Sequence, residues 1–118
     1  MMMNAISPQH YQKHPSGVEC IAAARHQTFC VGSALKYLWR AGLKGSRLED
    51  LQKARQYLAW AVADDARVRR GMAIDRWMTW YFRGEPRPED HTIYSILLGN
   101  LDVALMDLDG LIEAVGHD

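Results

Sequence analysis

Apolar residues recur at helical spacing along most of the chain, and no stretch has the strict alternation typical of a β-strand. The clearest segment starts at Ser46, which forms a capping-box pattern with Glu49 and is followed by apolar residues three and four positions apart. The pattern predicts five helices, over residues 17–26, 30–40, 46–70, 72–83 and about 89–115. We therefore predict an all-α fold, a compact bundle of about five helices.

The chain has the length of one domain, which we divide into three parts. Residues 1–16 form an irregular N-terminal arm, because Pro8 and Pro15 prevent a continuous helix. Residues 17–70 form the core of the candidate site. Residues 72–118 form the C-terminal helices, and apolar side chains on two sides of the helix over 72–83 suggest an oligomer interface.

Local signals set the expected helix ends. Ser16 with Glu19 predicts a capping box for the first helix, and Gly42 is expected to end the second in a left-handed conformation. Basic residues at 69 and 70 before Gly71 predict the end of the third helix. His14 is expected on the surface of the arm.

Charge is distributed unevenly although the net charge is zero. Residues 1–60 hold eight Lys or Arg and three acids, a net charge of +5, and the remainder is therefore −5. A basic half suggests an anionic ligand, whereas the acidic C-terminal helix argues against a long nucleic acid. The two halves could also attract each other, within one chain or between subunits. No apolar run approaches the roughly 18 residues of a membrane span, so we expect no membrane partner.

Cations gather where the second predicted helix meets the third. Lys36 and Arg40 lie one helical turn apart, Lys44 follows between two glycines, and a helix N-terminus comes next. Such an arrangement suits a phosphate group, because cations and free backbone N–H groups both bind anions. Tyr37 and Tyr57 could stack on a base. The alternative is that the cations form a solvated face and the aromatic rings belong to the core.

Several familiar chemistries are not supported by the sequence. The spacing of Cys20, Cys30 and the nearby histidines matches no common zinc pattern, so no zinc is expected. The segment from Gly42 to Ser46 is too short for a Walker loop and follows a helix. No ExxE pair is present, which argues against the all-α nucleotide pyrophosphohydrolases. Glu19 and Asp50 could still hold a magnesium ion that is bound mainly by phosphates.

Three segments carry a more specific resemblance, namely HYQKHPSGVECI, VGSALKYLWRAGLKG and EDLQKARQYL. They resemble a small phage and prophage family, mostly uncharacterised and also described as nucleotide-kinase-like. That description follows a podophage enzyme that phosphorylates deoxynucleoside monophosphates without a Walker loop and assembles as a large oligomer. The resemblance covers about residues 10–58. The family's usual Asn after the glycine is Ser33 here, which puts substrate preference or activity in question.

The resemblance implies a nucleotide-binding protein, with magnesium as a candidate ion, in the cytoplasm of a host bacterium and assembled as a homo-oligomer. On this reading Lys36, Arg40 and Asp50 are the catalytic candidates, and Glu19 and Asp50 the metal candidates. The candidate nucleotide-binding residues are His10, Tyr11, Ser33, Lys36, Tyr37, Arg40, Lys44, Lys53 and Tyr57.

Our first hypothesis is a nucleoside monophosphate kinase that transfers phosphate from a nucleoside triphosphate to a deoxynucleoside monophosphate. Such transfer requires mainly positioning and charge neutralisation. Two alternatives stay open. One is a binder that sequesters a nucleotide, such as a defence signal, without turning it over. The other is a module that interacts with a host protein.

Overall fold

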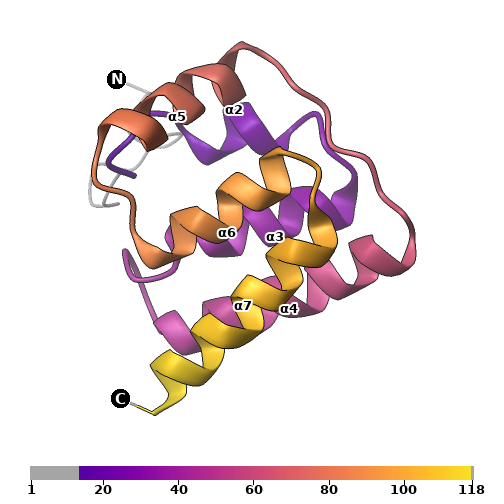
Figure 1. The fold of residues 1–118 in the computed structure, drawn as a ribbon, viewed down its shortest axis with the longest axis vertical. Coiled ribbons are helices and arrows are strands. Elements are labelled where there is room, and N and C mark those ends of the chain that lie inside the picture. The colour runs from indigo at the N-terminus through magenta and orange to yellow at the C-terminus, as the bar shows by residue number, and fades with distance from the viewer. Residues whose placement is uncertain (1–13, 118) are drawn as a thin grey trace, which may run out of the picture.

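A computed structural model describes residues 14–117 of the chain. Within that range the chain forms six helices and no strand, which confirms the all-α fold (Figure 1). The helices are α2 (Cys20–Ala24), α3 (Phe29–Arg40), α4 (Arg47–Ala63), α5 (Met72–Arg83), α6 (Pro88–Leu97) and α7 (Leu101–Gly116). None of them is long and apolar enough to cross a membrane.

The helices α3 and α4 are the centre of the packing. They lie side by side; α6 packs against α3, and α7 packs against both α4 and α6 (Figure 1). At one end of the molecule, α2 contacts α3 and α5. The side of α3 with Val31, Leu35 and Leu38 is fully buried, whereas Lys36 and Tyr37 on its outer side reach solvent. The fold therefore leaves the outer face of α3 open for a ligand.

One predicted helix is two helices in the structure, because the chain turns at Gly99. The N–H of Asn100 donates to the carbonyl of Ser95, and the N–H of Gly99 donates to that of Ile96. These two bonds form a Schellman motif, with Gly99 in the left-handed conformation at φ 86°. The prediction of one helix over about 89–115 was wrong, because the apolar stripe continues across the turn and hides it.

The third predicted helix was too long. α4 ends at Ala63 rather than near residue 70. The N–H of Ala66 donates to the carbonyl of Ala61, and Asp65 has a φ of 52°, so this end is again a Schellman motif. Asp is one of the few non-glycine residues that tolerate this conformation.

Capping was predicted correctly at one helix and wrongly at another. The Ser46 hydroxyl accepts from the N–H of Glu49 and caps α4, which is one of the two hydrogen bonds of the predicted capping box. The capping box of Ser16 and Glu19 does not form, because α2 begins later and Glu19 is its N-cap without a side-chain hydrogen bond. The Ser16 hydroxyl instead accepts from the N–H of Val18.

Gly42 has the expected positive φ, at 80°. It follows Ala41 at φ −55° and ψ 128°, and the N–H of Leu43 donates to the carbonyl of Arg40. These angles and this bond define a type II turn, which requires a positive φ at its third residue. The turn places Lys44 beside the C-terminal end of α3.

Candidate functional site

The cations of the second predicted helix line a pocket at the C-terminal end of α3. It measures about 210 Å³. Its lining residues are His14, Cys20, Lys36, Trp39, Arg40, Leu43 and Lys44. We call it the cationic pocket. Of the described residues that line it, three are Lys or Arg and none is Asp or Glu, so its electrostatic character favours an anion.

A second pocket of about 490 Å³ adjoins the first. Its lining residues are Cys20, Ile21, Ala24, Arg25, Gln27, Thr28, Phe29, Gly32, Ser33 and Lys36. We call it the apolar pocket, because small and apolar side chains make up much of its wall. It shares Cys20 and Lys36 with the cationic pocket. The structure thus brings Ser33 and Lys36 into one pocket and Lys36, Arg40 and Lys44 into the other.

Cys20 lies at the boundary of the two pockets. Burial raises the pKa of its thiol to about 12, and the nearby charge of Lys36 offsets only part of that rise. The group is therefore a protonated thiol at neutral pH, with little nucleophilic or metal-binding character. Cys20 and Cys30 are both free thiols.

Tyr37 and Tyr57 lie beside these pockets in a row of aromatic side chains on α3 and α4. Their rings stack with centroids 5.9 Å apart and an interplanar angle of 10°. The Nζ of Lys36 lies 5.1 Å from the Tyr37 ring centroid, and the Nζ of Lys53 lies 5.6 Å from it. Both distances suit cation–π contacts. The candidate binding residues Lys36, Lys53 and Tyr57 therefore all contact the ring of Tyr37.

Asp50 has a structural partner. Its carboxylate is buried, and its Oδ2 accepts from Arg40 Nε at 3.1 Å, while the Arg40 side chain stays 40% exposed. Glu19 is exposed at the start of α2. Across residues 14–117, no three His, Cys, Asp or Glu side chains gather where they could share a metal ion. Asp50 Oδ2 is bonded to Arg40, so a magnesium ion at Asp50 would have to share the carboxylate with that arginine. His10 and Tyr11 lie outside the described residues.

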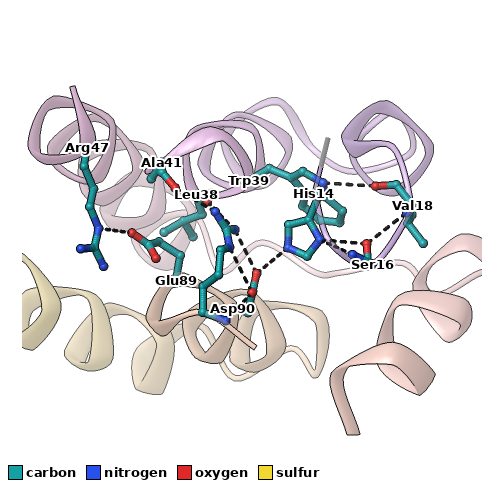
Figure 2. Close-up of polar contacts among 10 residues, drawn as sticks. His14, Ser16, Val18, Leu38, Trp39, Ala41, Arg47, Glu89 and Asp90 are labelled. Atoms are coloured by element: carbon teal, nitrogen blue, oxygen red, sulfur yellow. Dashed lines mark hydrogen bonds and ion pairs between the residues drawn. The ribbon is translucent and has the colours of Figure 1, made fainter. Parts of the chain in front are cut away.

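A buried polar network joins His14 to α6, and no pattern in the sequence predicted it (Figure 2). The side chains of His14 and Asp90 are fully buried, and His14 Nε2 lies 2.6 Å from Asp90 Oδ1. Arg87 donates to both oxygens of the same carboxylate, at 3.0 and 3.1 Å. Burial raises the pKa of Asp90. The hydrogen bonds from His14 and Arg87 and the charge of Arg87 together lower it by more than that, so the pKa lies below its ordinary value. We call His14, Arg87 and Asp90 the buried network.

The buried network holds the end of α3 that forms the cationic pocket. Arg87 Nη1 donates to the carbonyl of Ala41 at 2.8 Å, and its Nη2 donates to that of Leu38 at 3.2 Å. These carbonyls have no partner within α3, because the last carbonyls of a helix lie beyond its hydrogen-bonding register. Arg87, the N-cap residue of α6, therefore connects α6 to this helix end.

The expectation of a surface His14 was wrong. Its ring lies 5.1 Å from Trp39 and 4.9 Å from Trp80, measured between centroids. The backbone N–H of Ser16 donates to Nδ1 at 3.0 Å, which assigns the proton to Nε2, facing Asp90. Trp80, on the predicted helix over 72–83 that has apolar side chains on two sides, therefore has a partner within the chain. Glu89 and Asp90 open α6 directly after Pro88, but their local spacing does not show that both are buried.

A second buried carboxylate pairs the two halves of the chain. Arg47 Nε donates to Glu89 Oε2 at 2.6 Å, and the Glu89 side chain is only 2% exposed. The attraction between the basic and acidic halves is therefore intramolecular at this point.

The part of the chain that lines both pockets matches a known protein family. Residues 6–59 match one protein family, which is described as a protein of unknown function, DUF3310. The matched segment contains α2, α3 and most of α4, and its description names no activity. No curated protein and no solved structure matches the chain. The segment that forms both pockets is thus similar to the uncharacterised DUF3310 family.

Proposed function

We propose that the outer face of α3 binds a nucleotide. The observation that carries the proposal is the pair of adjoining pockets with opposite character, which meet at Cys20 and Lys36. A nucleotide has the same division, because its phosphates are anionic and its base presents flat, largely apolar faces. The apolar pocket alone falls within the range of about 300–1,000 Å³ that is typical of small-molecule sites.

In this arrangement the phosphates occupy the cationic pocket. Lys36, Arg40 and Lys44 supply charge-assisted hydrogen bonds. The base and sugar occupy the apolar pocket, where the Ser33 hydroxyl can donate or accept a hydrogen bond. Lys36 lies between the two parts and therefore contacts the phosphate nearest the sugar.

Binding is better supported by these pockets than phosphoryl transfer, because Asp50 is buried against Arg40 and Glu19 lines neither pocket. The kinase hypothesis and the sequestering hypothesis share the binding step. The resemblance to phage and prophage proteins, and the homo-oligomer that it implies, stay predictions beside this proposal.

Calorimetric titration with dTMP, dGMP and ATP, each with and without magnesium, tests the proposal. Lys36→Ala should weaken nucleotide binding roughly 10- to 100-fold, since a hydrogen bond to a charged group contributes about 1.5–3 kcal/mol. Arg76→Ala is the matched control, because Arg76 is exposed on α5 and lines neither pocket. Absence of binding for every nucleotide would contradict the proposal.

A coupled assay of ADP formation from ATP with dTMP or dGMP separates the two activities. Turnover that is lost in Lys36→Ala would identify a kinase. Tight binding without turnover would identify a sequestering protein.

A further inference from the structure

Four aromatic side chains form a continuous row on the outer face of α3 and α4, which we call the aromatic row: Phe29, Tyr37, Tyr57 and Trp60. Tyr57 is its centre, with ring centroids 5.7 Å from Phe29 and 5.6 Å from Trp60. Phe29 is 76% exposed and Trp60 51%. Exposing two large rings to water in this way costs free energy that a bound partner would recover.

The aromatic row adjoins lysines and both pockets, which distinguishes it from core side chains that reach the surface. Lys36 and Lys53 both lie over the Tyr37 ring. Phe29 also lines the apolar pocket, and Lys36 lines both pockets. The rings, the lysines and the cationic pocket therefore belong to one continuous surface.

We infer that this surface binds a short single-stranded nucleic acid. Bases would stack on Phe29 and Trp60, and phosphates would contact Lys36, Lys53 and the cationic pocket. Aromatic rings interleaved with cations are typical of single-strand sites, because every base has a face for stacking and every nucleotide has a phosphate. The inference rests on the proposed function in one respect, since the cationic pocket holds one phosphate in both.

A single strand fits this surface better than a duplex, in which the base faces are covered by stacking. Acidic residues also limit the path of the strand. Glu49 lies one turn before Lys53 on α4, and Asp64 follows one turn after Trp60. Two acids of α7 have partners within the chain, because Asp109 forms an ion pair with Arg55 and Asp107 accepts from the Ser95 hydroxyl.

The test is fluorescence anisotropy with a labelled oligothymidylate of about eight nucleotides, within the range of known single-strand sites. The full chain should bind it more tightly than it binds dTMP and more tightly than a duplex of equal length. Trp60→Ala and Phe29→Ala should each weaken oligonucleotide binding on the order of tenfold, the usual loss for one stacking residue. Phe82→Ala is the matched control, because Phe82 is 69% exposed but lies on α5.

Salt dependence gives a second readout. Each phosphate neutralised in a single strand contributes about 0.7 to the slope of log K against log salt. Lys53→Ala should therefore reduce that slope by about 0.7 while the chain stays folded.

The outcomes separate this inference from the proposed function. Oligonucleotide binding that is unchanged in Trp60→Ala and Phe29→Ala overturns the inference, and dTMP binding that depends on Lys36 would still support the nucleotide site. Oligonucleotide binding with the expected variant effects but no mononucleotide binding supports the inference and contradicts the nucleotide site. Self-association in sedimentation velocity that both variants abolish overturns the inference, because a second copy of the chain would then cover the row.

Discussion

Two clusters of aromatic and charged residues contact α3, namely the buried network around His14 and the aromatic row with its lysines. In the buried network, Arg87 and Asp90 pair with each other, and Trp39 and Trp80 surround His14. On the outer face, two lysines lie over the half-buried ring of Tyr37.

The difference lies in where the carboxylates are. Asp50, Glu89 and Asp90 are buried, and each pairs with an arginine. Arginine suits this role because its planar fork matches a carboxylate, whereas lysine is a compact, strongly hydrated charge. Burial and pairing with an arginine thus distinguish the carboxylates that stabilise the fold from the exposed lysines that can meet a ligand.

Removing Asp90, the centre of the buried network, should have the largest effect on stability. Asp90→Ala should lower the free energy of unfolding by about 3–5 kcal/mol, because it leaves the largely buried charge of Arg87 without its carboxylate partner. Urea unfolding measures the loss. Asp109→Ala removes an exposed ion pair with Arg55 and should cost less than about 1 kcal/mol. Equal losses in the two variants would show that the buried network does not stabilise the fold.

Acid should remove part of the same stabilisation. The pKa of Asp90 is lower in the folded chain than its ordinary value, so the folded state favours the ionised carboxylate. Its contribution is fully present above the unfolded-state pKa of about 3.9 and is lost as the pH falls through the lower folded value. Urea midpoints measured from neutral pH into this acid range should fall more steeply for the natural chain than for Asp90→Asn. Parallel curves would contradict the assignment.

Substitutions of two neighbouring cations on α3, Arg40 and Lys36, should differ in their effect on stability. Arg40→Ala should cost about 1–3 kcal/mol of stability, because it leaves the buried carboxylate of Asp50 without its partner. Lys36→Ala should change stability by less than about 0.5 kcal/mol, because Lys36 is exposed. Thermal unfolding beside nucleotide titration distinguishes them. If Lys36→Ala unfolds the chain as readily as Arg40→Ala, the outer face is structural.

The smallest expected effect concerns two glycines in the same predicted helix. Gly99→Ala should destabilise the chain by about 1 kcal/mol, because φ is 86° there even though a Cβ would meet no atom within 4 Å. Gly110→Ala should stabilise it by about 0.5–1 kcal/mol, since Gly110 lies inside α7 with equally open space. Thermal midpoints of the two variants should therefore shift in opposite directions. Shifts of the same sign would contradict the turn at Gly99.

Periodicity predicted the helical class, the positions of α3 and α5 and the start of α4 well, because their apolar faces are buried in one core. It failed at Asp65 and Gly99, where a left-handed residue ends a helix while apolar residues continue at similar spacing. The apolar pattern of a sequence indicates which residues are buried, but it does not indicate where a helix ends and the chain changes direction.

The candidate site was predicted in composition but not in arrangement. Helical spacing was enough to place Lys36 and Arg40 together, and both line the cationic pocket. The partner of Arg40 within α4 and the boundary between the two pockets depend on how α2, α3 and α4 pack.

The sequence alone determined that the chain is helical and that its cations concentrate around the end of α3, because both follow from spacing along the chain. Only the tertiary structure decided which of those cations are bound to buried carboxylates. Glu89 and Asp90 are separated from Arg47 and His14 by long stretches of chain, 42 and 76 positions. Such pairs form only when α6 packs against α3, so no local pattern could identify them.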